Sequence, residues 1–297
     1  MSDSRFHGAG VALVTPFTTA GEVDYPSLAR VTRHTIDNGI DFLVVLGTTA
    51  ETPTLTVEEK EMVIRTILEV NAGRKPVVLG VGGNDTASVI KQLQNQSFTG
   101  IDGILTVAPY YNKPNQTGLL RHFEVIGTVS PLPVIIYNVP GRTGSNISAD
   151  TTLRLASDVP NIVATKEASG NLEQIMVILR DRPSGFSVLS GDDSLTLPLL
   201  SLGAEGVISV IANLLPGQMS KMAEMAAEGN ITGARRIHYE LLEISTLIFA
   251  EGSPAGIKSA LKQKGLCGDS LRLPLVPVSS ALSEKIRLSL EQLGVRR

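Results

Sequence analysis

Lys166 follows a short apolar segment, residues 162–165 (IVAT), which has the composition of a buried strand. Removing a lysine from water disfavours its charged form. The neutral amine that results can form a Schiff base with a carbonyl substrate. A simpler interpretation is a lysine that pairs with the adjacent Glu167 or reaches solvent. The segment alone leaves both open, so the positions of the other polar residues must decide between them.

Three of the five tyrosines lie where apolar segments give way to polar residues: Tyr110 and Tyr111 after one segment, and Tyr137 at the end of the next. A phenol can carry protons for imine chemistry when it belongs to a hydrogen-bonded chain. We expect Tyr137 to lie one strand away from Lys166, with Thr48 and Tyr111 extending the chain toward solvent. The two neighbouring tyrosines could instead form a packing or subunit-interface pair, which we prefer for Tyr110.

Two further stretches offer groups that bind carboxylates. The turn formed by Gly47, Thr48 and Thr49 leads toward a helix, and it supplies backbone N–H groups and hydroxyls for a small anion. Arg142 supplies a guanidinium for bidentate capture of a second carboxylate. Both have plainer alternatives, because the threonines could only cap or turn and Arg142 could be a solvated loop residue.

Four other chemically capable residues are most simply structural. Glu51 is expected to be a loop or first-turn acid, and Asp192 and Asp193 are expected to cap a helix that starts near residue 195. Cys267 lies in a turn at residues 265–268 without a partner base nearby, so a nucleophilic role is not favoured.

Composition restricts the class of protein. The chain has 297 residues, 42% hydrophobic and 19% charged, which describes a globular protein with a large core. A net charge of −3 and a single cysteine give no reason to expect nucleic acid, an anionic membrane or an internal disulfide. Residues 1–7 lack a signal-peptide core and no apolar run is long enough to span a membrane, so we expect a cytoplasmic protein. No metal is expected, because the four histidines show no ligand spacing: His7, His34, His122 and His238.

Strand-like and helix-like segments alternate along the chain. The apolar, β-branched runs are typical of parallel strands covered on both faces. Eight such units with no strand left over favour a closed (β/α)8 TIM barrel over a Rossmann-like sheet, whose Gly-x-Gly-x-x-Gly turn is not supplied by residues 80–85. The predicted strands are residues 10–17, 42–48, 76–81, 103–108, 133–138, 162–166, 186–190 and 206–212.

The alternation stops near residue 230. Three amphipathic helices are predicted beyond it, at residues 234–250, 255–264 and 283–293, with a proline-punctuated connection at 271–277. We therefore predict two parts, a catalytic barrel over residues 1–230 and a C-terminal helical extension over residues 231–297.

The predicted fold brings the polar stretches together. In a TIM barrel the working residues lie at the carboxyl ends of the strands. Lys166 then shares one mouth with Tyr137, Thr48, Tyr111 and Arg142, and an amine-based active site becomes the better interpretation. For this chemistry Glu167 should point to the opposite side of the strand.

At these strand ends the sequence resembles the dihydrodipicolinate synthase family, within the pyruvate-dependent class I aldolases. The resemblance spans nearly the whole chain and includes LRLP at 271–274. The motifs are GTTAE at 47–51, YYNKP at 110–114, YNVPGRT at 137–143, KEASGN at 166–171, GDD at 191–193 and GVISV at 206–210.

The resemblance implies that pyruvate forms an imine with Lys166 and that the derived enamine attacks L-aspartate 4-semialdehyde. The product is 4-hydroxy-tetrahydrodipicolinate, an intermediate of diaminopimelate and lysine biosynthesis, and the covalent imine replaces any cofactor. Tyr137 would transfer protons, and Thr48 would belong to its relay. Tyr111 would complete the relay from a neighbouring subunit, in a homotetramer built from tight dimers.

The resemblance also implies substrate contacts. Thr49 and Ile208 would line the pyruvate site, and Arg142 would hold the carboxylate of the semialdehyde. The main alternative is a sister aldolase, such as an N-acetylneuraminate lyase-like or 2-keto-3-deoxy sugar acid aldolase, but residues 141–143 and 166–170 favour the synthase. A non-catalytic pyruvate-binding barrel would be expected to lack Lys166 or Tyr137.

Two departures from the family pattern are visible. Ala50 replaces the glycine usual after the two threonines, which could restrict the turn. Val57 or Lys60, and Ser88, stand where many lysine-sensitive members carry a histidine and an acidic residue, although Asn84 and Tyr110 are retained. We therefore predict weak or absent inhibition by lysine.

Overall fold

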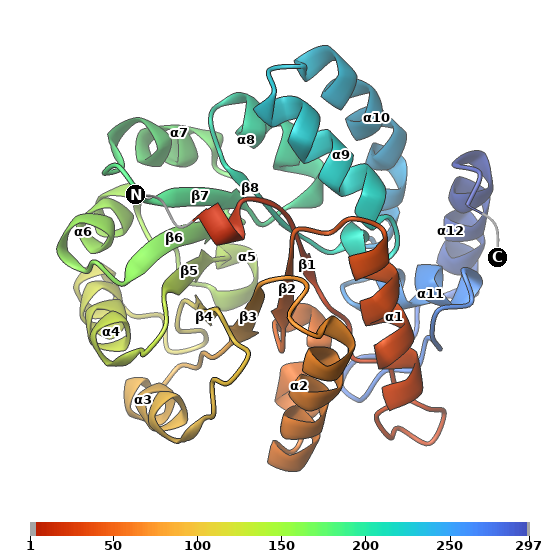
Figure 1. Ribbon diagram of the computed structural model, residues 1–297, viewed down its shortest axis with the longest axis horizontal. Helices are drawn as coiled ribbons and strands as arrows, with labels where there is room; N and C mark the ends of the chain where they lie inside the picture. The colour runs from red at the N-terminus through yellow and green to blue at the C-terminus, as the bar shows by residue number, and fades with distance from the viewer. Residues whose placement is uncertain (1–3, 296–297) are drawn as a thin grey trace. The chain divides into compact units, whose positions relative to one another are not determined.

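The computed structural model describes residues 4–295. Two short stretches lie outside the described part: residues 1–3, which begin the stretch predicted to lack a signal-peptide core, and residues 296–297. Eight parallel strands form a closed barrel in chain order, with helices in the connections, which confirms the predicted fold class (Figure 1). The strands are β1 (Gly8–Ala12), β2 (Phe42–Val45), β3 (Val77–Gly80), β4 (Gly103–Val107), β5 (Val134–Asn138), β6 (Ile162–Glu167), β7 (Ser187–Ser190) and β8 (Gly206–Ser209).

The chain divides into two compact units. Within the described residues, the first unit contains residues 4–8 and Pro76–Ile208, and the second contains Ala9–Lys75 and residues 209–295. This division differs from the predicted boundary between residues 230 and 231, which stays a prediction.

The first unit contains strands β3 to β7 and the helices that follow them (Figure 1). Side chains cap four of these helices, since Asp85, Asn115, Ser148 and Asn171 each accept a hydrogen bond from a backbone N–H of the first turn. The strands are almost fully buried. The helices are α3 (Thr86–Asn95), α4 (Gln116–Val129), α5 (Pro140–Thr143), α6 (Ala149–Asp158), α7 (Leu172–Asp181) and α8 (Thr196–Ser201).

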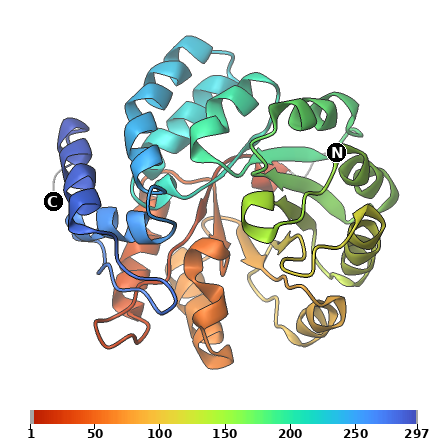
Figure 2. The same cartoon turned by 180° about the vertical axis from the view of Figure 1, so that it is seen from behind.

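The second unit contains most of β1, all of β2 and the C-terminal helices. Thr56 and Glu59 form a capping box at the start of α2. The three predicted C-terminal helices are present, and α12 contacts both α10 and α11 (Figure 2). The helices are α1 (Tyr25–Asp37), α2 (Val57–Asn71), α9 (Pro216–Ala227), α10 (Ile231–Leu247), α11 (Ala255–Gln263) and α12 (Ser280–Gln292).

Three strands end three or more residues earlier than predicted. The runs at 10–17, 42–48 and 206–212 continue into turns, and two of them end in short 3-10 helices, Thr48–Ala50 and Ile211–Asn213. Hydrophobicity alone cannot separate a strand from a buried turn of similar composition. In the turn after β1, side-chain hydrogen bonds replace strand pairing. The Asn213 side chain accepts from Val14 N at 3.1 Å and donates to Ala12 O at 2.8 Å.

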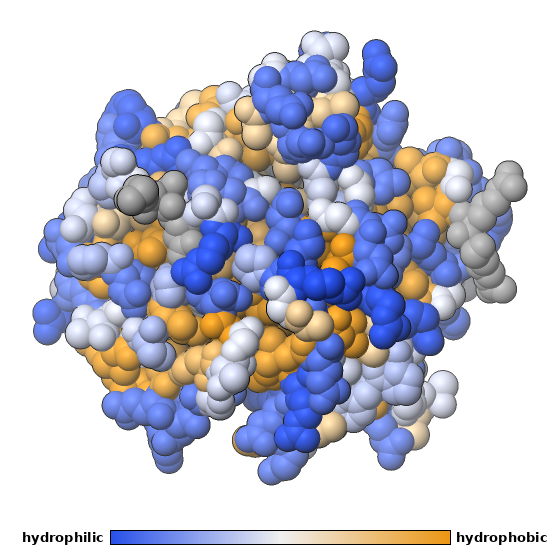
Figure 3. All heavy atoms as spheres, viewed as in Figure 1, coloured by the Kyte–Doolittle hydropathy of each residue, from blue (hydrophilic) through white to orange (hydrophobic). Residues whose placement is uncertain are grey.

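Apolar side chains are interspersed with hydrophilic ones on the face of the molecule drawn in Figure 3. Among the helices of residues 4–295, none has both the length and the apolar character required to cross a membrane.

Candidate active site

Lys166 and Tyr137 lie side by side on neighbouring strands. Tyr137 of β5 is in register with Lys166 of β6, and the Lys166 Nζ atom lies 4.2 Å from the centre of the Tyr137 ring. Both side chains are buried, with exposed fractions of 5% and 6%. The structure therefore brings together the amine and the phenol that the sequence analysis selected.

Glu167 does not pair with Lys166. Its carboxylate accepts hydrogen bonds from Asn138 Nδ2 at 3.0 Å and from Ser169 Oγ at 2.8 Å. Burial raises the pKa of Glu167 to about 7, against the opposing effect of these hydrogen bonds. Among the described residues no carboxylate forms an ion pair with Lys166. The alternative interpretation, a lysine paired with its neighbour in sequence, is therefore wrong.

Asn138 joins the ends of the two strands that carry the pair. Its amide nitrogen also donates to Asn146 Oδ1 at 2.9 Å, and its amide oxygen accepts from Ile147 N at 2.9 Å. Asn138 is itself in register with Glu167, one position beyond Tyr137 and Lys166. Because buried polar groups with satisfied partners hold one geometry, this network fixes the relative position of the amine and the phenol.

Gly191 leaves room for the lysine side chain. It follows β7, and its N–H donates to Glu167 O at 2.7 Å. A Cβ atom at Gly191 would lie 3.0 Å from Lys166 Cε and 2.8 Å from Ala168 Cβ. No role was predicted for the glycine of the Gly-Asp-Asp motif, because local sequence does not show which side chain passes over a glycine.

The other predicted site residues of the first unit differ in their exposure to solvent. Arg142 is in α5 and is exposed, and its side chain has no hydrogen bond or ion pair with residues 4–295. Tyr111 is 87% exposed, has a left-handed φ of 72°, and donates its N–H to Thr143 O. Ile208 is buried in β8. In the described chain neither Arg142 nor Tyr111 is hydrogen-bonded to the Lys166–Tyr137 pair.

Asp192 has the structural role that was predicted for it. Its carboxylate accepts from Ser194 N at 2.9 Å and Ser194 Oγ at 2.7 Å, which caps the turn leading into α8.

Thr48 and Thr49 belong to the second unit and open the 3-10 helix Thr48–Ala50. Thr48 is exposed and Thr49 is buried. The backbone of Ala50 is not among the left-handed residues, so alanine fits where the family usually has glycine. The predicted relay through Thr48 stays a prediction.

Glu51 is not the simple loop acid that was expected. It is buried, with a left-handed φ of 53°, and forms an ion pair with Lys258 of α11. Lys258 is fully buried and also donates to Ser270 O at 3.0 Å. Burial lowers the pKa of Lys258, and the charge of Glu51 opposes this effect. A lysine within an apolar helix, at residues 255–261, was the signal that could have revealed this pair.

A closed (β/α)8 barrel with a buried lysine beside a tyrosine at adjacent strand ends is the arrangement of a barrel enzyme of the class I aldolase type. The sequence profile of the dihydrodipicolinate synthetase family matches residues 5–293, and the chain belongs to this family.

Similar proteins agree over the full length. A 4-hydroxy-tetrahydrodipicolinate synthase of Parabacteroides distasonis is 50% identical over 296 residues, which covers 100% of each chain. The crystal structure of dihydrodipicolinate synthase from Aquifex aeolicus is 44% identical, with a TM-score of 0.94, and covers 98% of this chain and 99% of that chain. A structure described as the first monomeric dihydrodipicolinate synthase variant is 39% identical, with a TM-score of 0.95 and 98% coverage of both chains.

These comparisons confirm the prediction of an enzyme, and they favour 4-hydroxy-tetrahydrodipicolinate synthase activity over a sister aldolase.

Proposed function

We propose that this enzyme condenses pyruvate with L-aspartate 4-semialdehyde through a Schiff base on Lys166, and forms 4-hydroxy-tetrahydrodipicolinate. The observation that carries the proposal is the buried Lys166 amine, which has no carboxylate partner among residues 4–295 and lies against the Tyr137 ring. A buried amine without an ion pair is suited to attack a carbonyl carbon.

The chemistry balances without an oxidant or a reductant. The Lys166 amine adds to the keto carbon of pyruvate, and loss of one water gives the imine. Loss of a methyl proton converts the imine to an enamine, whose carbon attacks the aldehyde carbon of the semialdehyde. The amino group of the semialdehyde then attacks the imine carbon, which closes the ring and releases Lys166. One water leaves per product formed.

Tyr137 would transfer the protons of these steps. Its ring lies against Lys166, and a positioned acid–base group contributes about 10²–10⁴-fold to turnover. Thr48 and Tyr111 would connect it to solvent through hydroxyl groups.

The substrate carboxylates would be held at two places. Thr49 and Ile208 would line the pyruvate site, where the 3-10 turn offers N–H groups to an anion. Arg142 would bind the carboxylate of the semialdehyde, and the absence of an internal partner among the described residues leaves its donors available. We propose no cofactor beyond the covalent imine, and within residues 4–295 no group of three metal-ligating side chains could hold a metal ion. Activity should therefore survive dialysis against EDTA.

We further propose a homotetramer of tight dimers, in which Tyr111 enters the site of a neighbouring subunit. An 87% exposed tyrosine with a strained backbone supports a role outside its own chain. Mixing Lys166→Ala subunits with Tyr111→Phe subunits tests this directly, because only an exchanged tyrosine gives one complete site per mixed dimer. A sedimentation measurement showing an active monomer would contradict the proposal.

Borohydride trapping tests the covalent step. Pyruvate followed by borohydride should add one reduced pyruvate unit to the peptide that contains Lys166, and Lys166→Ala should abolish it. Lys258 is an internal control, since it is also buried but is paired with Glu51 and should stay unmodified. An adduct on any other lysine would contradict the assignment. Product formation with aspartate semialdehyde, and its absence with sugar-derived aldehydes, tests the substrate.

The remaining proposals concern the setting of the reaction. We place the enzyme in the cytoplasm, at the step that commits aspartate semialdehyde to diaminopimelate and lysine synthesis. Inhibition by lysine is expected to be weak or absent, and strong inhibition by micromolar lysine would contradict this expectation.

A further inference from the structure

Glu51 is the last residue of the turn that contains Thr48 and Thr49. Its N–H donates to Thr48 O at 3.2 Å, and its carbonyl oxygen accepts from Thr54 N at 3.0 Å and Thr54 Oγ1 at 2.9 Å. The residue is left-handed, a conformation that non-glycine residues keep only when their surroundings impose it. The contacts of the Glu51 side chain must therefore hold this turn.

The side chain of Glu51 is buried against Lys258 and the backbone of Arg272. Lys258 forms an ion pair with one carboxylate oxygen, and the backbone N–H of Arg272 donates to the other at 3.2 Å. The ammonium of Lys258 and the guanidinium of Arg272 lie 4.2 Å and 4.6 Å from the centre of the Phe17 ring. The Phe17 ring thus contacts both cations and links Lys258 to Arg272.

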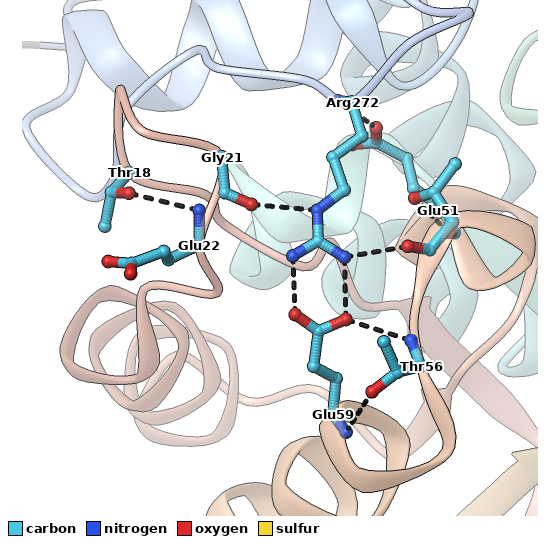
Figure 4. Close-up of polar contacts among 8 residues, drawn as sticks. Thr18, Gly21, Glu22, Glu51, Thr56, Glu59 and Arg272 are labelled. Atoms are coloured by element: carbon cyan, nitrogen blue, oxygen red, sulfur yellow. Dashed lines mark hydrogen bonds and ion pairs between the residues drawn. The ribbon is translucent and has the colours of Figure 1, made fainter.

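Arg272 extends the cluster to the start of α2. Its guanidinium donates to both oxygens of Glu59, at 2.7 and 2.5 Å, to Thr54 O at 2.7 Å and to Gly21 O at 2.8 Å. Figure 4 shows the guanidinium between Gly21 and the carboxylate of Glu59, which also accepts from the N–H of Thr56. A planar guanidinium holds such a set of acceptors in one geometry. Arg272 therefore holds both the last residue of the turn at 47–51 and the segment of chain that follows it.

We infer that Glu51 is a positioning residue. Its contacts with Lys258 and Arg272 hold the Thr48–Thr49 turn in the conformation that binds pyruvate. This inference rests on the proposed function, in which Thr49 binds pyruvate and Thr48 joins the proton relay. A buried pair of opposite charges specifies one geometry, whereas apolar packing alone tolerates small rotations. Rotation of Glu51 moves Thr48 directly, through the hydrogen bond between the Glu51 N–H and Thr48 O.

The consequence is a specific kinetic effect. A displaced turn weakens the pyruvate carboxylate site, so KM for pyruvate rises, while KM for the semialdehyde, which is held by Arg142, stays near that of the parent. A role limited to stability would lower the melting temperature and leave both KM values unchanged in the folded enzyme.

The test uses the double variant Glu51→Gln/Lys258→Met, because removing one partner alone leaves a buried charge and destabilises the protein. We expect KM for pyruvate to rise about 10-fold or more, since losing one hydrogen bond to a charged carboxylate weakens binding by about that factor. Borohydride should still trap pyruvate on Lys166 at saturating pyruvate. A folded double variant with the parent's KM for pyruvate would overturn the inference.

A second variant covers the case in which the double variant does not fold. Glu59→Gln removes one charged partner of Arg272 and leaves the Glu51–Lys258 pair intact. Its control is Glu205→Gln, because the Arg182–Glu205 pair has closely similar exposure, 18% and 23% against 20% and 21%. Glu59→Gln should raise KM for pyruvate and Glu205→Gln should not; equal effects would overturn the inference. If the parent enzyme gives no adduct on Lys166, the proposed function fails instead.

Discussion

Replacing Gly191 by alanine should disturb the Lys166 amine. The added Cβ would lie 2.8 Å from Ala168 Cβ, 3.0 Å from Lys166 Cε and 3.1 Å from Glu167 O. The first distance is about 0.6 Å below the start of ordinary contact (2.8 against 3.4 Å). Two of the three neighbours, the Ala168 Cβ and the Glu167 carbonyl, are not flexible side-chain ends. Strand ends β6 and β7 must therefore separate, or Lys166 must leave its position beside Tyr137.

The expected magnitude follows from that displacement. Overpacking of this kind destabilises a protein by about 1–3 kcal/mol. Misplacement of a reacting group by about 1 Å costs about 100-fold in rate, so a shift of roughly half that size should lower kcat/KM for pyruvate by about 10-fold. Steady-state kinetics gives kcat/KM, borohydride trapping at several times gives the rate of imine formation, and urea unfolding gives stability.

Gly83→Ala is the matched control, because its Cβ would meet only Val89 Cγ2 at 3.4 Å and its φ is not left-handed. This variant should keep the parent's kinetics. If Gly191→Ala forms the imine as fast as the parent, the close packing around Lys166 does not position the amine, and the argument is refuted.

Three further predictions concern single residues. Tyr137→Phe should lower kcat by about 10²–10⁴-fold while pyruvate still traps on Lys166, and near-normal turnover would remove the phenol from the mechanism. Burial raises the pKa of Glu167 to about 7, so its contribution to stability is fully present below pH 4.5 and is lost as pH rises through 7. Urea unfolding should show a loss on the order of 3 kcal/mol from this group, and Glu167→Gln should remove that pH dependence. Burial also raises the pKa of the Cys267 thiol to about 12, so a thiol reagent at pH 8 should label the unfolded chain and spare the folded enzyme.

Much of the fold follows from local sequence. Near-continuous apolar runs predict parallel strands, and side chains such as Asp192 and Thr56 predict where helices begin, because both signals act over a few residues. Counting eight units then places Lys166 and Tyr137 at neighbouring strand ends, without knowledge of any distance. Strand ends were less predictable, since the apolar runs continue through the turns after β1, β2 and β8.

Two lysines separate what the sequence determined from what only the tertiary structure decided. Lys166 and Lys258 both lie in apolar segments, and the sequence by itself determined that a buried position would desolvate either amine. It did not determine their partners, because Glu51 lies 207 residues from Lys258 along the chain, and nothing local connects the two. The fold places that carboxylate against Lys258 and the phenol ring of Tyr137 against Lys166. Long-range packing thus decides which buried amine is held in an ion pair and which is left for chemistry.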